Sequence, residues 1–266
     1  MNLTDPGTLQ RTLARHGLRA DKSLGQHFLT SEKVVNAIVA EVNDFHSVLE
    51  IGPGPGVLTQ CLCTAVKSVS AIEIDARMIA VLAESSPQAK VMQLDALTID
   101  LATILSEMTE PRALVSNLPY YITGPLLDRI FGARSAWQRA VLMMQREVGD
   151  KILATVGDRR RGALSVVAQA QFEVTKVCNV PPGAFLPPPK VESIVLKLTP
   201  LETTYEAGFF PFVHAGFTQP RKTIANNLKP FGVTPETISR AGIKDLARPH
   251  EISLEEWLRL WEIRKS

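Results

Sequence analysis

The sequence predicts an α/β fold with an open, largely parallel sheet in residues 1–200, followed by a small all-helical domain in residues 201–266. The first observation is an apolar strand at 48–51 that runs into a glycine-rich turn and then a helix. The second is that four apolar segments in 48–117 end in glycine or polar residues, as parallel strands do where open sheets bind ligands. The third is that beyond Thr199-Pro200 the apolar spacing is helical only.

Composition is that of a globular protein. Hydrophobic residues make up 45% and charged residues 21%, which is enough for a core and argues against disorder. The net charge of +2 is too mild to predict nucleic-acid binding by itself. Of the three cysteines, Cys61 and Cys63 face different sides of an expected helix, which favours reduced thiols over a metal site. We find no apolar leader and no membrane-length run, so a cytoplasmic protein is expected.

Residues 1–30 are expected to form a helix and then an ordered loop. Leu9 and Leu13 lie at helical spacing in residues 3–16. The loop that follows has no clear period and contains His27. From the residues alone, a histidine satisfied by a backbone carbonyl is the favoured interpretation.

The strand at 48–51 enters the turn Gly52-Pro53-Gly54-Pro55-Gly56. Glycine lets the backbone come close to a ligand at a helix N-terminus. The dinucleotide pattern G-x-G-x-x-G is absent, because Val57 occupies its third glycine position. The unit therefore favours a nucleotide cradle that differs from the NAD type, and a purely structural turn is the alternative.

Acidic residues end the next two strands. Glu73 and Asp75 lie about twenty residues beyond the glycine turn, where a carboxylate suits the two hydroxyls of a ribose. Glu73 is the better candidate, and Asp75 is expected to cap the next helix. A third strand at 90–94 is followed by Asp95 and Ala96. Asp95 can accept a hydrogen bond from the amine of an adenine, or it can cap a helix.

The fourth strand, 113–117, delivers Asn117-Leu118-Pro119-Tyr120 at its carboxyl end. The amide can accept hydrogen bonds from an amino group, and the ring can stack on a flat base. Taken alone, the motif reads equally well as a turn with an aromatic plug. Four strand ends of this kind at one crevice favour a binding site.

Two later segments are unusual. A fifth strand is expected at 139–144, and a later loop at 157–162 contains Arg159, Arg160 and Arg161, which either contact phosphate or form solvated surface. Residues 181–191 hold five prolines, which cannot continue a helix or sit in a central strand. We expect a stiff loop that presents an exposed Phe185, which is unfavourable unless the ring covers something, and a simple connector is the alternative.

The expected C-terminal helices contain an apolar set that includes Phe209 and Phe212. They also carry Arg221 and Lys222 at the start of one helix, as a possible basic face. An ordinary solvated helix surface explains these two residues equally well.

Together these motifs resemble the ribosomal RNA adenine dimethyltransferases, and are closest to the type that acts on small-subunit RNA. The resemblance runs from about Lys22 to Leu198 and continues more weakly through the C-terminal helices. The matching segments, in the order of the family, are GQHFL at 25–29, EIGPGPG at 50–56, IEID at 72–75, DA at 95–96, NLPYYI at 117–122 and PPGAFLPPPKVES at 181–193.

The resemblance implies a Rossmann-like domain that binds S-adenosylmethionine, within residues 1–200, and no metal. Implied cofactor residues are Gly52 and Gly54 for the methionine portion, Glu73 for the ribose, Asp95 and Ala96 for the adenine, Asn117, and His27 and Leu29 from a loop that closes over the cofactor. Asparagine is common in the family at the position of His27, so this residue is a departure.

The resemblance also implies the reaction, a transfer of methyl groups to N6 of two adjacent adenosines in a hairpin loop near the 3′ end of 16S rRNA. Asn117 and the Leu118 carbonyl would accept the amino hydrogens, beside Pro119, while Tyr120 and Phe185 would hold the two faces of the base. Expected RNA contacts in both parts of the chain are Arg159, Arg160, Arg161, Lys190, Arg221 and Lys222. The expected partner is the immature 30S subunit, bound by a monomer during ribosome biogenesis.

Two other functions compete with this one. A 23S rRNA methyltransferase of the antibiotic-resistance type would use the same chemistry on another adenosine. An RNA-binding assembly or transcription factor, with methylation secondary, would need the same basic residues. An NAD oxidoreductase is disfavoured by Val57.

Overall fold

The computed structural model describes residues 1–19 and 27–264, which divide into two compact units. Unit 1 comprises Met1–Gly149 and Val174–Pro200. Unit 2 comprises Asp150–Glu173 and Leu201–Ser266. Within the described part of the chain, no helix has the length and apolar character needed to cross a membrane.

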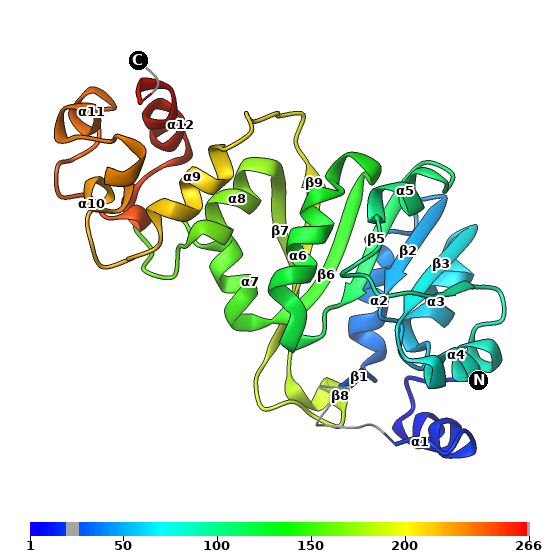
Figure 1. Ribbon diagram of the computed structural model, residues 1–266. Helices are drawn as coiled ribbons and strands as arrows, with labels where there is room; N and C mark the ends of the chain where they lie inside the picture. The colour runs from blue at the N-terminus through cyan, green and yellow to red at the C-terminus, as the bar shows by residue number, and fades with distance from the viewer. Residues whose placement is uncertain (20–26, 265–266) are drawn as a thin grey trace. The chain divides into compact units, whose positions relative to one another are not determined.

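A seven-stranded sheet forms the centre of the α/β part (Figure 1). Its strand order is β4-β3-β2-β5-β6-β9-β7. The strands β2 to β6 run parallel to their neighbours, and β9 is antiparallel to β6. The bounds are β2 Ser47–Ile51, β3 Ser68–Glu73, β4 Lys90–Gln93, β5 Arg112–Asn117, β6 Arg139–Gln145, β7 Phe172–Val180 and β9 Ser193–Pro200.

The register of the parallel strands brings their carboxyl ends together. Ile51, the last residue of β2, lies opposite Ile72 of β3 and Ser116 of β5. The next residues along these three strands are therefore neighbours at one edge of the sheet. All of β2 is buried, as expected of a central parallel strand covered on both faces. The predicted α/β fold with a parallel-rich sheet and helices in the C-terminal part is confirmed.

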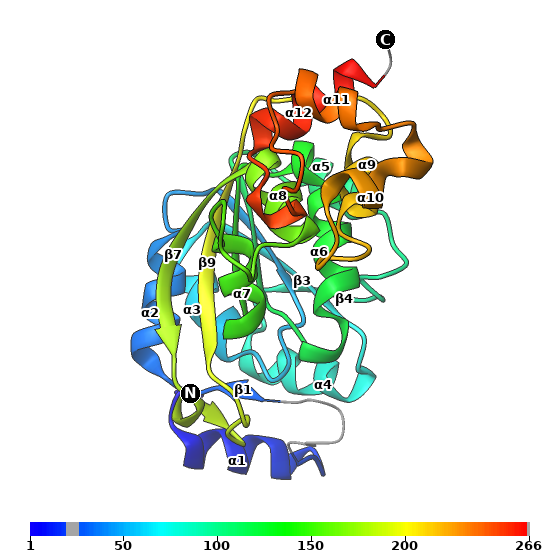
Figure 2. The same ribbon diagram turned by 90° about the vertical axis from the view of Figure 1, so that its left-hand side faces the viewer.

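Helices cover both faces of this sheet. In Figure 2, α2 and α3 lie on one side of the strands, and α5 and α6 lie on the other. Two of the connecting helices begin at an aspartate whose side chain accepts a backbone N–H, Asp75 for α4 and Asp100 for α5. The helices that begin in unit 1 are α1 Pro6–Arg15, α2 Glu32–Ala40, α3 Val57–Ala65, α4 Ala76–Ser85, α5 Leu101–Ser106, α6 Thr123–Gly132 and α7 Arg146–Leu153.

A two-stranded antiparallel ribbon joins the N-terminal segment to the proline-rich segment. It consists of β1, Phe28–Leu29, and β8, Phe185–Leu186. The backbone N–H of Thr30 extends this pairing by donating to the carbonyl of Ala184. The proline-rich segment was expected to be only a stiff loop, but its residues Phe185 and Leu186 form a strand that pairs with β1.

Unit 2 is built around aromatic side chains. Phe209, Phe212, Trp257 and Trp261 are buried there together with Val166. Because Val166 belongs to α8, residues 150–173 pack with the C-terminal helices, whereas the sequence analysis placed them in the first domain. The helices are α8 Ala163–Gln171, α9 Phe209–Gly216, α10 Ile224–Leu228, α11 Pro235–Arg240 and α12 Leu254–Ile263.

Candidate active site

A cavity of about 400 Å³ opens at the carboxyl ends of β2, β3, β4 and β5, within unit 1. It brings together the predicted cofactor and catalytic residues, with Phe185 as the exception. The predicted residues that line it are His27, Leu29, Gly52, Gly54, Glu73, Asp95, Ala96, Asn117, Leu118, Pro119 and Tyr120.

The glycine-rich turn between β2 and α3 forms one wall of the cavity. Gly52, Gly54 and Gly56 have φ angles of 71°, 55° and 92°, a left-handed conformation that other residues adopt only with strain. A Cβ on Gly52 would meet no atom within 4 Å, whereas one on Gly56 would lie 2.5 Å from Ser85 Oγ. Gly56 is therefore required for packing, and Gly52 leaves the backbone accessible from the cavity.

Glu73 lies at the end of β3 and is buried. Its Oε2 accepts a hydrogen bond from the Gly54 N–H at 3.0 Å, and its Oε1 accepts one from the Asp75 N–H at 2.9 Å. Burial raises the pKa of Glu73, while these backbone donors oppose the shift. Each carboxylate oxygen keeps further acceptor capacity toward a ligand. Asp75 caps α4, which confirms that prediction.

Asp95 lies beyond β4 and is half-buried. Its Oδ1 accepts a hydrogen bond from the Leu97 N–H at 2.9 Å, so the side chain does shape the local turn. Its Oδ2 has no hydrogen-bond partner in the described ranges, and it is available to a donor in the cavity. The helix-cap alternative is therefore wrong, since Asp95 shapes a turn and α5 is capped by Asp100, and the adenine contact stays a prediction.

Among the lining residues that the sequence analysis missed, Ile74 and Glu50 stand out by their chemistry. Ile74 is 62% exposed although it is large and apolar, and it lines the cavity between two acidic residues. An exposed apolar side chain at this place in the cavity can pack against the face of an aromatic ring in a ligand. Glu50 is buried in β2, and burial raises its pKa to about 7. The sequence did contain a signal for Glu50, because an acidic residue inside an otherwise apolar strand is unusual.

Asn117 is positioned by the N-terminal segment. Its Nδ2 donates to the backbone carbonyl of His27 at 3.3 Å. This contact orients the amide and leaves Oδ1 without a hydrogen bond from any described residue. The adjoining Leu118 N–H donates to the carbonyl of Met143 at 2.9 Å, which fixes the motif against β6. An acceptor oxygen is thus presented at the end of β5.

His27 has the backbone partner that was favoured for it and also lies at the cavity, where a contact with the cofactor stays a prediction. Its Nδ1 lies 2.8 Å from the carbonyl oxygen of Pro187, so the ring is satisfied by a backbone carbonyl as predicted. It also lines the cavity, and its ring stacks on that of Tyr120. The preceding residues of the same motif, Gly25 and Gln26, lie outside the described residues.

Phe185 does not contribute to the cavity. It is only 4% exposed and packs in the core of unit 1, where it pairs with Leu29 across the β1–β8 ribbon. The prediction of an exposed ring on a rigid loop is therefore wrong. The prolines stiffen the segment, but pairing with β1 turns this side chain inward.

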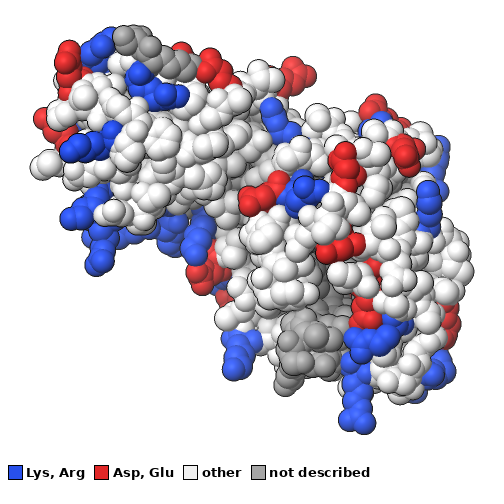
Figure 3. Space-filling model, viewed as in Figure 1, with Lys and Arg blue, Asp and Glu red and all other residues white. Residues whose placement is uncertain are grey.

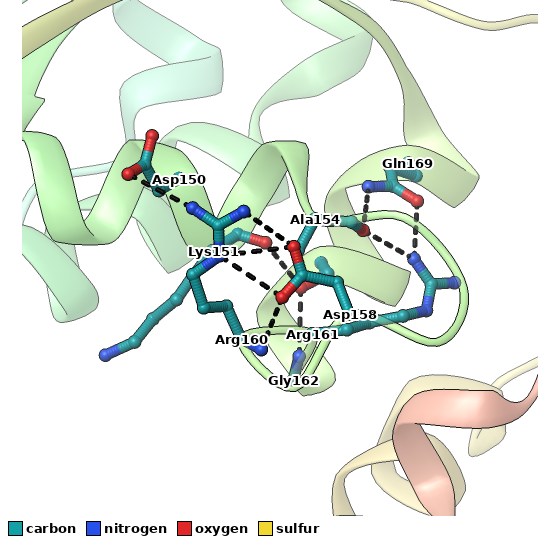
Figure 4. A network of polar contacts seen from close by, with 9 residues as sticks. Asp150, Lys151, Ala154, Asp158, Arg160, Arg161, Gly162 and Gln169 are labelled. Carbon is teal, nitrogen blue, oxygen red and sulfur yellow. Dashed lines mark hydrogen bonds and ion pairs between the residues drawn. The ribbon is translucent and has the colours of Figure 1, made fainter.

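The basic residues proposed from the sequence do not behave alike. Arg161 is 5% exposed and donates to the Ala154 carbonyl and to Gln169 Oε1, so the prediction of an RNA contact is wrong for it (Figure 4). Arg160 forms ion pairs with Asp150 and Asp158. Arg160 is itself exposed despite these ion pairs, and so are Arg159, Lys190, Arg221 and Lys222. Figure 3 shows basic side chains projecting from unit 2 around α10.

Comparison with known proteins agrees with this geometry. The family model described as ribosomal RNA adenine dimethylase matches residues 17–265. The Ribosomal RNA small subunit methyltransferase A of Lactiplantibacillus plantarum is 37% identical over 98% of this chain and 95% of its own length. A dimethyladenosine transferase from Plasmodium falciparum has a TM-score of 0.75 at 27% identity, covering 90% of this chain and 98% of that chain.

A second solved structure, the 23S rRNA methyltransferase ErmE, has a TM-score of 0.67 and 27% identity over 90% of this chain and 100% of that chain. The family-model match covers nearly all of the sequence and includes both units. The chain belongs to the ribosomal RNA adenine dimethylase family and is an S-adenosylmethionine-dependent methyltransferase.

Proposed function

We propose that this chain dimethylates N6 of two adjacent adenosines in a hairpin loop near the 3′ end of small-subunit (16S) rRNA. The observation that carries the proposal is that the glycine-rich turn, Glu73, Asp95 and the Asn117 motif all line the same cavity. The choice of the small subunit is supported by the name of the Lactiplantibacillus plantarum relative. The large-subunit alternative shares the fold, as the similarity to ErmE indicates.

The residues present fit S-adenosylmethionine. Gly52 leaves open space beside the backbone for the methionine portion. Glu73 keeps acceptor capacity for ribose hydroxyls, and Asp95 Oδ2 is available to an adenine amine. Ile74 and Ala96 supply apolar surface for the adenine ring. His27 and Leu29 cover the same cavity from the N-terminal segment.

When bound, S-adenosylmethionine supplies a methyl group on a positively charged sulfur. Asn117 Oδ1 and the Leu118 carbonyl oxygen each accept a hydrogen bond from one N–H of the adenosine amino group. These two bonds orient the lone pair of the amino nitrogen. Neither group is a strong base, so the contribution of the chain is positioning rather than proton abstraction. Because Phe185 is buried, Tyr120 provides the stacking surface for the base. Stacking of a base on an aromatic ring contributes about 1–3 kcal/mol to binding.

Four exposed basic residues, without the ion-paired Arg160, are proposed to contact RNA phosphates, and they come from both units. Lys190 belongs to unit 1, whereas Arg159, Arg221 and Lys222 belong to unit 2. Each contact of this kind adds a sequence-independent, salt-dependent share of affinity. We further propose that the enzyme acts as a cytoplasmic monomer on the immature 30S subunit.

The test is to map dimethyladenosine in ribosomal RNA from a host strain that lacks this chain. We expect two adjacent positions near the 3′ end of 16S rRNA to lose the modification. The wild-type chain should restore it, and the Asn117→Ala variant should not. Loss of a modified adenosine from 23S rRNA instead would assign the chain to the large-subunit alternative. Unchanged modification in both RNAs would refute the proposal.

A further inference from the structure

Tyr120 is held at two points inside unit 1. Its hydroxyl lies 2.7 Å from Ser193 Oγ. Its ring stacks on the imidazole of His27, with the ring centres 5.7 Å apart and the planes inclined by 29°. Tyr120 itself begins a single 3₁₀ turn, Tyr120–Ile122, which is a weak local support for a ring that has to be placed accurately.

Ser193, in contrast, occupies a rigid position. It is the first residue of β9, lies opposite Gln145 of β6, and has no exposed surface. Its hydroxyl is therefore fixed by the sheet. Burial raises the pKa of Tyr120, so this phenol stays protonated at neutral pH and can share a hydrogen bond with the serine.

His27 is anchored as firmly on the other side. Its Nδ1 is 2.8 Å from the Pro187 carbonyl, and the residue after it, Phe28, pairs with Leu186. The imidazole occupies one face of the Tyr120 ring, so a base has to stack on the opposite face. One anchor, Pro187, lies in the segment 181–191 that contains the five prolines, and the other, Ser193, follows that segment as the first residue of β9.

We propose that the hydrogen bond between the Ser193 and Tyr120 hydroxyls fixes the plane of the stacking ring, which makes Ser193 a positioning residue for methyl transfer. The proline-rich segment, which anchors His27, and the start of β9, which carries Ser193, then hold Tyr120 from two sides, in place of the second stacking ring expected at Phe185. The inference rests on the proposed function for the identity of the stacked base.

The experiment is a double-mutant cycle of Tyr120→Phe and Ser193→Ala. The single-turnover rate of methyl transfer to small-subunit RNA is measured together with the Kd of S-adenosylmethionine and the unfolding temperature. A hydrogen bond between neutral groups corresponds to about a fivefold effect. We expect each variant to be about fivefold slower, and the double variant to be no slower than either single variant, with cofactor affinity unchanged.

The matched control is Ser165→Ala in α8. Ser165 is also fully buried, and its hydroxyl donates to the Lys151 carbonyl, but it belongs to unit 2. It should lose stability without a change in methyl-transfer rate. Should Ser193→Ala fail to fold, Ser193→Cys replaces it in the cycle, because the thiol keeps the size and weakens the bond.

The proposal is overturned if the two effects multiply to about 25-fold, or if either single variant turns over within twofold of the wild type. A wild-type protein that methylates adenosine in another RNA but not in 16S rRNA would refute the proposed function alone. The cycle could then be repeated on that RNA, so the two failures are distinguishable.

Discussion

Replacing Glu50 by glutamine should remove a pH dependence from the stability of unit 1. Glu50 is buried in the middle of the sheet, and its Oε2 has no hydrogen-bond partner within residues 1–19 and 27–264. Burial raises the pKa of this carboxyl from 4.5 to about 7, and the negative charge of Glu73 contributes in the same direction. The unfolded chain has no such burial and ionises near the ordinary value.

Between pH 4.5 and pH 7 the folded protein therefore binds more protons at Glu50 than the unfolded protein does. The free energy of unfolding falls as the pH rises through this window, because stability decreases wherever the native state holds the extra proton. A pKa shift of this size corresponds to about 3 kcal/mol in the free energy of unfolding. This stability is fully present below pH 4.5, where the carboxyl is protonated in both states, and it is lost above pH 7. Glutamine has nearly the same volume and does not ionise.

The assay is denaturant unfolding of the wild type and of Glu50→Gln at intervals from pH 5 to pH 8. We expect the variant to gain up to about 3 kcal/mol relative to the wild type as the pH rises. Glu107→Gln, which alters an exposed carboxyl in the same unit, serves as the control and should follow the wild-type curve. Parallel curves for wild type and Glu50→Gln would show that this carboxyl does not change its protonation on folding.

Five other substitutions separate function from folding. Asn117→Ala should slow methyl transfer by at least about 100-fold, because it removes a positioned hydrogen-bond acceptor. The variant should still retain RNA in a filter-binding assay, and loss of RNA binding would contradict this role. Gly52→Ala should weaken cofactor binding, measured by calorimetry, and lower the free energy of unfolding by about 1–2 kcal/mol. Gly56→Ala should unfold far more readily, because the new Cβ would lie 2.5 Å from the hydroxyl oxygen of Ser85. Arg161→Ala should lower stability by about 2–3 kcal/mol and leave the salt dependence of RNA binding unchanged. Arg159→Ala should reduce that salt slope by about 1 without loss of stability, and the opposite pattern would reverse the two assignments.

The residues at strand ends could be predicted because sequence spacing and sheet geometry are directly linked. A parallel sheet places the carboxyl ends of neighbouring strands at one edge, and β4, β3, β2 and β5 are neighbours in that order. Glu73, Asp95 and Asn117 were therefore brought together by topology alone. Their precise partners, such as the His27 carbonyl for Asn117, depend on a contact across ninety positions of chain and are not encoded in local pattern.

Phe185 and Arg161 show what local pattern cannot decide. A run of prolines predicts stiffness, but the direction of a side chain between them depends on which strand the segment meets, here β1. Three consecutive arginines predict a solvated basic loop, yet Arg161 is drawn inward by the Ala154 carbonyl and Gln169. Phe185 meets a strand far away in the sequence, whereas the partners of Arg161 lie seven and eight residues away and reach it only through the way the loop folds back against α8.

Glu73 links the fold to the site. Because its two oxygens already accept the N–H groups of Gly54 and Asp75, it holds the glycine turn against the end of β3 before any ligand arrives. The same oxygens are the ones proposed to receive the ribose hydroxyls. A glutamine at this position would set an NH₂ group against one of the two backbone N–H donors. Any affinity lost in such a variant would thus combine a missing ligand contact with a displaced turn, so preorganisation of the cradle and recognition of the cofactor depend on one carboxylate.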